Sequence, residues 1–161
     1  MRAISIASLL ALGASAYRIA ILTDMHIDPS YNATCNIMCY DLGDYDRDPP
    51  KSLLNLMLSD LSTNYNRYDE IDAVLVTGDF VVHGLAQKDF RYSNWTLQKP
   101  IIQDVIQAIS AELPSVPIVS TIGNNDVIHH YQAPNGTNHD LFYNDLFKLW
   151  FSQNPSMAAD P

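Results

Sequence analysis

Residues 71–83, with the sequence IDAVLVTGDFVVH, constrain the fold more than any other stretch of this chain. The apolar residues 74–76 run into Gly78 and Asp79, and His83 follows four residues after the aspartate. A short apolar run that ends at a glycine is typical of a buried strand that stops at a sharp turn. Because ligands gather at the carboxyl ends of strands in open α/β folds, we expect the Asp79 carboxylate at a ligand-binding edge of a sheet.

Two other segments end in the same way. Residues 17–23 predict a first strand that runs into the Asp24–His26 segment (DMH), and residues 116–122 predict a third strand that runs into residues 123–126 (GNND). Three strand ends would therefore deliver aspartate, histidine and asparagine side chains to one edge of the sheet. This mixture of oxygen and imidazole donors suits divalent metals such as zinc, manganese or iron.

Apolar residues recur at helical spacing in three further segments. Residues 51–64, 96–113 and 140–151 are predicted to be helices, with Pro100 in the first turn of the second and Asp140 as a cap of the third. The leucines and the methionine of the first helix are interpreted as core residues. Strands that alternate with helices predict a parallel sheet with right-handed crossovers, so the fold class is α/β. The residues predicted to face the core from the second and third helices are Ile101, Ile102, Val105, Ile106 and Ile109, and Leu141, Leu146, Leu149 and Trp150.

The composition fits one folded domain rather than a disordered chain, because 47% of the residues are hydrophobic and 17% are charged. The formal net charge is −9, with 9 lysine and arginine residues in all. A broad basic surface for nucleic acid is therefore not expected, since phosphate backbones are bound by clustered cations. A substrate that carries phosphate would need metal ions to supply positive charge locally.

The N-terminal segment predicts entry into the secretory pathway. Residues 1–16 have a basic start, a short apolar run and an A-x-A end, which is the layout of a signal peptide; a buried N-terminal strand or helix is the alternative. Its apolar run is too short to span a bilayer, and no second stretch is long and apolar enough. The mature domain would comprise residues 17–161, in an extracellular or a vacuolar or lysosomal compartment. Three N-glycosylation sequons support this route, and they begin at Asn32, Asn94 and Asn135.

Cys35 and Cys39 are the only cysteines. In an oxidising compartment a small disulfide loop is favoured over a metal site, because nothing nearby completes a cysteine-based zinc set. The four-residue spacing permits such a bridge only if the loop turns tightly.

Three ordered motifs resemble those of the calcineurin-like metallophosphoesterases. They are Asp24-x-His26, Gly78-Asp79-x-x-x-His83 and Gly123-Asn124-Asn125-Asp126, and each follows a predicted strand. More narrowly, residues 24–31 with cysteines just after them resemble the acid sphingomyelinase-like phosphodiesterases and the related vacuolar endopolyphosphatases, and the GNND spelling is closer to the latter. The resemblance covers about residues 18–130. It implies the N-terminal half of an αββα sandwich, with a mostly parallel sheet flanked by helices.

The resemblance also implies a site with two divalent metal ions. Asp24 and His26 would hold one ion, Asp79 would bridge the two, and Asn124 would hold the second. Zinc is the first expectation, with manganese or iron as alternatives. Two such ions would activate water and clamp the phosphoryl oxygens of the substrate during attack.

His83 and Asn125 are the residues expected to act on the substrate. By resemblance, His83 would donate a proton to the leaving oxygen. Asn125 stands where the family commonly has a histidine, and an amide can donate a hydrogen bond to a phosphoryl oxygen but cannot transfer a proton at neutral pH. This substitution shifts the acid role towards His83. Taken singly, His26 also fits a surface loop residue and His83 a residue that starts a helix.

Other polar residues near these motifs have plainer interpretations. Asp28 would either support His26 from behind or form a turn before Pro29. The role of Tyr31 is equally open. Three further histidines are expected in solvent-exposed loops: His129, His130 and His139.

Three functional hypotheses follow. The first is a metal-dependent phosphoesterase acting on a lipid, a nucleotide or polyphosphate, and paired with a missing C-terminal half. That half is expected because the family supplies further histidine ligands, including a Gly-His-x-His motif, and a second sheet from downstream. The second is a truncated, catalytically incompetent secreted fragment or binding remnant of such an enzyme. The third, a disulfide-bearing secreted ligand or adhesion module, leaves the three ordered motifs unexplained.

Overall fold

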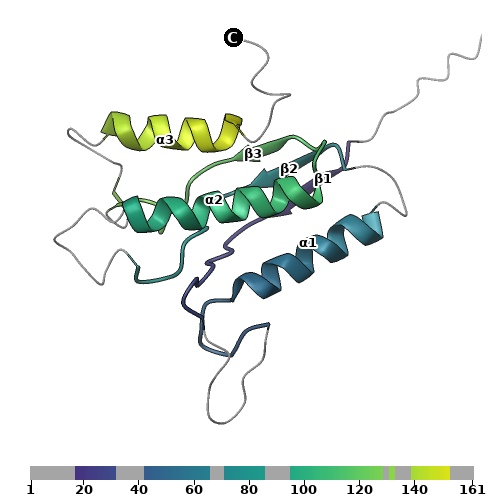
Figure 1. Cartoon of the computed structure of the whole chain (residues 1–161), viewed down its shortest axis with the longest axis horizontal. Helices are drawn as coiled ribbons and strands as arrows, with labels where there is room; N and C mark the ends of the chain where they lie inside the picture. The colour runs from purple at the N-terminus through teal and green to yellow at the C-terminus, as the bar shows by residue number, and fades with distance from the viewer. Residues whose placement is uncertain are drawn as a thin grey trace, which may run out of the picture.

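A computed structural model describes residues 17–31, 42–65, 71–85, 95–128, 131–132 and 139–152. Strands and helices alternate along these residues, as the sequence predicts (Figure 1). The elements are β1 (Ile19–Leu22), α1 (Lys51–Tyr65), β2 (Ala73–Val76), α2 (Trp95–Glu112), β3 (Ile118–Ser120) and α3 (His139–Ser152). The predicted α/β class is confirmed.

The three strands form one parallel sheet in the order β1-β2-β3. Ile21 pairs with Leu75, and Leu75 pairs with Val119, so all three strands end at the same edge of the sheet. Parallel strands require crossover connections, and α1 and α2 provide them. The segments that follow β1, β2 and β3 are thereby brought together.

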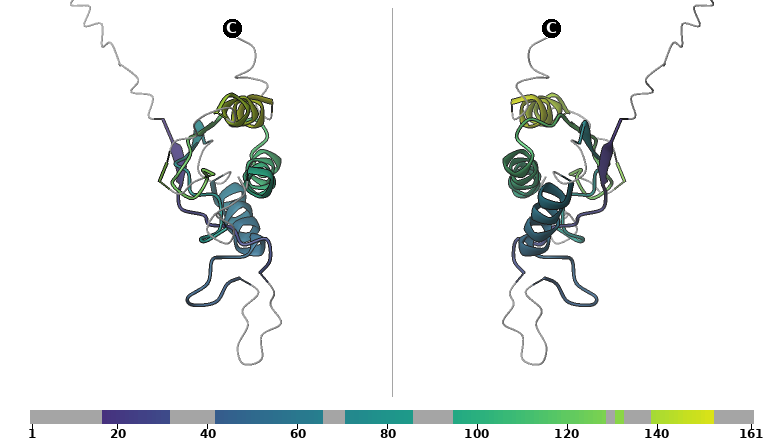
Figure 2. Two further views of the ribbon diagram at one scale, coloured as in Figure 1. Left: turned by 90° about the vertical axis from the view of Figure 1, so that its left-hand side faces the viewer. Right: turned by 90° about the vertical axis from the view of Figure 1, so that its right-hand side faces the viewer.

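The helices α1 and α2 lie on the same side of the sheet (Figure 2). Strand residues that face them, such as Val74, Val76 and Ile118, are buried. Alternate residues point to the opposite face, where Ile21 is 62% exposed and Val119 is 46% exposed. The described part of the chain therefore has one covered sheet face and one open apolar face.

The core stripe of α2 agrees with the prediction. Its five predicted core residues, from Ile101 to Ile109, are all buried. Pro100 lies in the second turn rather than the first, because the helix begins at Trp95. A proline there removes the N–H that would bond to the carbonyl of Thr96.

The prediction for α1 was partly wrong. Leu54 and Leu58 are buried, but Leu53, Leu56 and Met57 are 38–51% exposed. The buried residues form a narrow stripe at a spacing of four, because α1 packs against α2 on one side only. A leucine-rich helix therefore does not bury all of its leucines here.

The prediction for α3 was wrong at its N-terminal end. Leu141 is 56% exposed, whereas its neighbour Phe142 is fully buried with Leu146 and Leu149. The spacing of Phe142, Leu146 and Leu149 places them on one helical face, from which Leu141 is turned away. His139 is the first helical residue rather than a loop residue, although it is exposed as expected. Asp140 consequently lies in the first turn and does not cap the helix.

Candidate metal centre

The segments after β1 and β2 stay paired beyond the ends of the strands. The N–H of His26 donates to the carbonyl oxygen of Asp79 at 2.9 Å, and the N–H of Ile27 donates to that of Phe80 at 2.9 Å. Ile27 and Val81 form an isolated parallel bridge. These bonds set the two motif-bearing segments in register side by side.

Asp24, His26 and Asp79 come together at this edge of the sheet. Each offers one ligand atom, and these atoms lie within 4.8 Å of one another. The Nε2 atom of His26 is 3.8 Å from Oδ1 of Asp24 and 3.8 Å from Oδ2 of Asp79. The side chains of His26 and Asp79 are 11% and 13% exposed, whereas that of Asp24 is 64% exposed. The cluster is therefore anchored in the protein and open to solvent on one side.

Each carboxylate of the cluster uses one oxygen for a hydrogen bond and turns the other towards Nε2 of His26. Oδ2 of Asp24 accepts a hydrogen bond from the hydroxyl of Thr23. Oδ1 of Asp79 accepts one from the backbone N–H of Asn125 at 2.9 Å. The oxygens left over, Oδ1 of Asp24 and Oδ2 of Asp79, are those that face the imidazole.

The tautomer of His26 follows from its buried contact. Its Nδ1 atom lies 3.0 Å from the carbonyl oxygen of Val81. A carbonyl only accepts, so Nδ1 carries a proton, and Nε2 is the nitrogen that faces the two carboxylates. Backbone carbonyls commonly orient metal-binding histidines in this way. The donor set of Asp24, His26 and Asp79 therefore fits a divalent metal ion.

The same three residues have left-handed backbone conformations. The φ angles are 51° at Asp24, 41° at His26 and 54° at Asp79. Positive φ is uncommon outside glycine, and each instance is held in place by its surroundings at some cost in stability. Such conformations at all three residues of one cluster indicate a site shaped for a ligand.

The carboxylate of Asp126 fixes the backbone of the loop that carries Asp79, a role that the sequence analysis missed. Its side chain is fully buried, and its carboxylate accepts four backbone hydrogen bonds. The donors are the N–H groups of Asp79 (2.7 Å), Gly123 (2.8 Å), Phe80 (2.8 Å) and Val81 (3.2 Å). Burial raises the pKa of Asp126 above its ordinary value, while the backbone donors act in the opposite direction. Its place at the end of GNND, before two apolar residues, was the available signal.

Gly78 and Gly123 allow the segments after β2 and β3 to touch. A Cβ atom on Gly78 would lie 2.2 Å from the backbone nitrogen of Gly123, and one on Gly123 would lie 2.2 Å from Oδ1 of Asp79. Gly78 also has a φ of 98°. A side chain at either position would push the two loops apart.

Asn124 and Asn125 lie in the loop after β3, beside Asp79. Asn125 is buried, and its described contact with Asp79 is made by its backbone N–H. Asn124 is half-buried. The predicted roles of the two side chains, in holding a metal ion and in binding a phosphoryl oxygen, remain predictions.

His83 stacks on His26. Their ring centroids are 3.8 Å apart with planes inclined by 24°. Both the backbone N–H and the Nδ1 atom of His83 contact the carboxylate of Asp48, at 2.5 Å and 2.8 Å. Asp48 was not singled out from the sequence, because no motif marks it within the long aspartate-rich stretch after β1. His83 lies in a turn rather than at the start of a helix.

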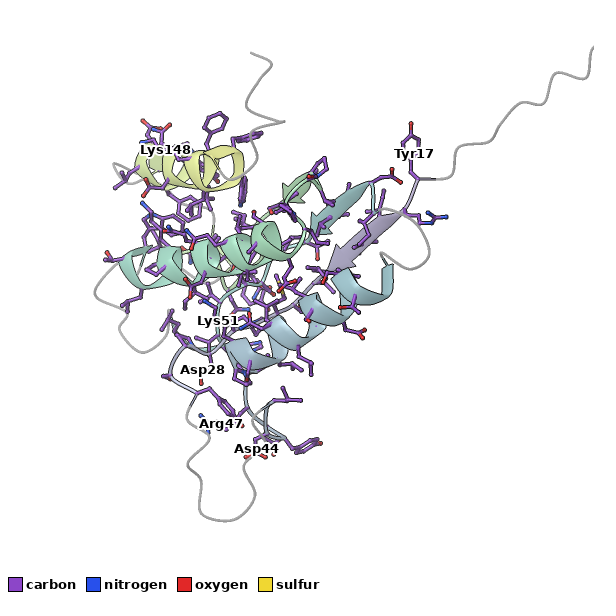
Figure 3. The ribbon with its side chains drawn as sticks, turned by 45° about the vertical axis from the view of Figure 1, so that its right-hand side comes forward. Tyr17, Asp28, Asp44, Arg47, Lys51 and Lys148 are labelled. Carbon is purple, nitrogen blue, oxygen red and sulfur yellow. The ribbon has the colours of Figure 1, made fainter. Side chains whose placement is uncertain are left out.

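Asp28 forms a turn and makes no described contact with His26. Its Oδ1 atom accepts hydrogen bonds from the N–H and the hydroxyl of Ser30, at 2.8 Å and 2.7 Å. Its Oδ2 atom lies 3.7 Å from the guanidinium of Arg47, which also lies over the ring of Tyr31. Asp28 and Arg47 lie close to each other in Figure 3. The contacts agree with the turn interpretation of Asp28.

Several predicted features fall outside the described residues. They are the signal peptide at residues 1–16, the sequons at Asn32, Asn94 and Asn135, the cysteines Cys35 and Cys39, and the histidines His129 and His130. None of the described helices is long and apolar enough to cross a membrane.

An apolar cavity of about 180 Å³ lies beside the cluster. Asp24 and Thr23 form its polar margin, and Met25, Leu53 and Met57 are among its apolar lining residues. Part of its wall thus comes from the α1 residues that the fold leaves exposed.

Comparison with protein families gives a match over residues 17–159 to the family described as calcineurin-like phosphoesterase. The chain belongs to this family. The calcineurin-like phosphoesterases hydrolyse phosphoesters with divalent metal ions, and the candidate cluster supplies a donor set for such an ion. A comparison with curated proteins found no significant match.

Proposed function

We propose that this protein hydrolyses phosphoesters at divalent metal ions held by Asp24, His26 and Asp79. One observation carries the proposal: Nε2 of His26 faces one unengaged oxygen from each of the two carboxylates, at 3.8 Å. This arrangement occurs at the carboxyl edge of the sheet in a chain of the phosphoesterase family. Zinc is the first candidate, and manganese and iron suit the same ligands. Asn124 would hold a second ion that shares Asp79.

When bound, divalent ions neutralise charge on the phosphoryl oxygens and activate water for attack. The residues of the chain supply the geometry. Asp126 and the N–H of Asn125 hold Asp79, and the carbonyl of Val81 holds His26. The solvent-exposed side of Asp24 leaves room for a substrate to enter.

In the proposed mechanism His83 transfers a proton to the leaving oxygen. Nδ1–H of His83 donates a hydrogen bond to the Asp48 carboxylate, so the proton that His83 transfers would come from Nε2. Stacking on His26 keeps the His83 ring next to the cluster. Asn125 cannot take this role, because an amide does not transfer protons at neutral pH.

The apolar cavity beside Asp24 favours a phosphoester that carries an apolar group, such as a lipid phosphodiester. Polyphosphate, which the GNND spelling suggests, would need a run of cations. A net charge of −9 makes such a run harder to assemble. The sphingomyelinase-like assignment is therefore our preferred substrate class within the family, and the secretory pathway is the compartment we propose for it.

The open sheet face bears on whether the 161 residues act alone. Ile21 and Val119 are exposed on that face, on the two outer strands and in register with Leu75 of β2 between them. We propose that further polypeptide, carrying the remaining histidine ligands, packs there in the active enzyme. Without it, the alternative function is that of an incompetent fragment that retains the metal cluster.

The test combines metal analysis with hydrolysis of bis-p-nitrophenyl phosphate. The purified protein is expected to bind zinc or manganese, and Asp79→Asn is expected to abolish that binding. Asp104→Asn is the matched control, because Asp104 lies on the exposed side of α2, where it pairs with Lys51. Hydrolysis with added metal supports the enzyme, and metal binding without hydrolysis supports the fragment. Equal metal binding by the wild type and Asp79→Asn would refute both.

A further inference from the structure

A single polar residue interrupts the apolar stripe of α2. Gln98 precedes Ile101 and Ile102 by three and four residues, so it lies on the same helical face. Its side chain is fully buried, with 0% exposure. Burying an amide costs free energy unless its polar atoms find partners, so this position calls for an explanation beyond packing.

Both N–H groups of the Gln98 side chain are directed at one loop. Nε2 donates to the carbonyl oxygen of Asn125 at 3.1 Å and to that of Val127 at 2.8 Å. The Oε1 atom is buried and finds no hydrogen-bond partner among the described residues. The side chain therefore bonds through its donors alone, and a methionine of similar length would fill the space without the unpaired oxygen.

That loop is the one that holds the metal cluster. The N–H of Asn125 donates to Oδ1 of Asp79, and the Asp126 carboxylate accepts from the N–H of Asp79. Gln98 thus contacts the carbonyl oxygens of the two residues that flank Asp126. With Oδ1 of Asp79 engaged by Asn125, Oδ2 is the oxygen that faces His26.

We propose that Gln98 is a positioning residue for the metal site. It fixes the loop after β3 from within the core, and the loop in turn fixes the orientation of the Asp79 carboxylate. The proposal rests on the proposed function for its metal, but the hold on the loop is a property of the metal-free protein. Gln98 contributes no ligand atom itself.

The variant Gln98→Met tests this directly, with Gln107→Met on the exposed side of α2 as its control. Zinc affinity, measured by competition with a chromophoric chelator, is expected to weaken about tenfold in Gln98→Met and to stay unchanged in Gln107→Met. In the metal-free protein, hydrogen exchange at the Asn125 amide is expected to accelerate at least about tenfold in Gln98→Met. Unchanged affinity together with unchanged exchange would overturn the proposal.

A measurement on the wild type keeps the proposal falsifiable if Gln98→Met does not fold. The side-chain amide protons of Gln98 are expected to exchange with solvent far more slowly than those of Gln107. Equal rates would show that Gln98 does not hold the loop. If the wild type binds no metal, the proposed function fails, while the exchange at Asn125 still decides whether Gln98 holds the loop.

Discussion

At the scale of single residues, the cluster depends on groups that never touch a substrate. Asp24, His26 and Asp79 adopt left-handed conformations that most residues avoid. Asp126 offsets part of this cost, because one buried carboxylate satisfies four backbone N–H groups at the turn after β2 and at Gly123. The stability of the site should therefore be most sensitive at Asp126.

Replacing Asp126 with asparagine should destabilise the fold strongly. The amide nitrogen of Asn would face two backbone donors in place of a carboxylate oxygen, and those donors would be buried without partners. We expect a loss of about 3–5 kcal/mol in the free energy of unfolding, measured by urea denaturation. Asp104→Asn should lose less than about 1 kcal/mol, as is usual for an exposed ion pair. Equal losses in the two variants would contradict the role given to Asp126.

Asp48→Asn should impair the proton transfer and spare the metal. If hydrolysis is detected, kcat should fall about tenfold or more for a phosphodiester with an alkyl leaving group. It should change little for a p-nitrophenyl ester, whose leaving group departs without a proton. Parallel assays with the two substrates measure this ratio, and an equal loss for both would assign Asp48 a purely structural role.

The sequence predicted which residues gather at the site better than how they are held. The strand-end positions of Asp24, His26 and Asp79 follow from the alternation of strands and helices, because parallel strands end at a common edge. The contacts of Asp48 with His83 and of Gln98 with the loop join residues that are distant in sequence. No local pattern encodes such contacts, so they emerge only from the packed fold.

At the scale of elements, the partly buried carboxylate of Asp145 joins α3 to α2. Asp145 of α3 accepts a hydrogen bond from the indole N–H of Trp95 and from Lys99, each at 2.9 Å. Burial acts to raise the pKa of Asp145, but these two partners outweigh it and hold the pKa below its usual value. The ionised carboxylate therefore stabilises the packing of the two helices.

The contribution of Asp145 should depend on pH. An aspartate with a depressed pKa in the folded state adds stability above its unfolded pKa of about 3.9, and loses it as the pH falls through the folded value. The difference in unfolding free energy between the wild type and Asp145→Asn should thus be constant near neutrality and shrink below about pH 4. Urea denaturation of both proteins between neutral and acidic pH measures it. A difference that grows on acidification would contradict this assignment.

Helical periodicity correctly predicted the buried residues of α2. It wrongly predicted burial for some apolar residues of α1 and for Leu141 of α3. Several faces of a helix look alike when five leucines and a methionine fall within nine residues, as they do at residues 53–61 of α1. Which leucines are buried depends on the angle at which the helix meets its neighbours. That angle is a property of the packed elements and cannot be deduced from spacing alone.

At the scale of the whole molecule, we expect the open sheet face to determine whether the chain self-associates in solution. Ile19, Ile21 and Val119 are each 46–62% exposed there. Contiguous exposed apolar surface usually marks an interface or promotes association. We expect the 161-residue chain to self-associate and to bind a hydrophobic dye.

The double substitution Ile21→Glu and Val119→Glu should reduce both properties. The charges would replace exposed side chains, so the melting temperature should change little. Sedimentation velocity and dye fluorescence provide the measurements, with Leu141→Glu on the exposed side of α3 as a control for charge alone. If the control variant suppresses association equally, the sheet face is not its source.

The paired segments after β1 and β2 have a consequence for how this protein can diversify. The backbone N–H of His26 donates a hydrogen bond to the carbonyl oxygen of Asp79. An insertion between Leu22 and His26 would therefore displace one candidate metal ligand relative to the other. Lengthening the chain after Asp28 leaves that bond intact. Changes in the length of the stretch that leads to α1 can therefore alter substrate preference, while the spacing between His26 and Asp79 in the cluster stays the same.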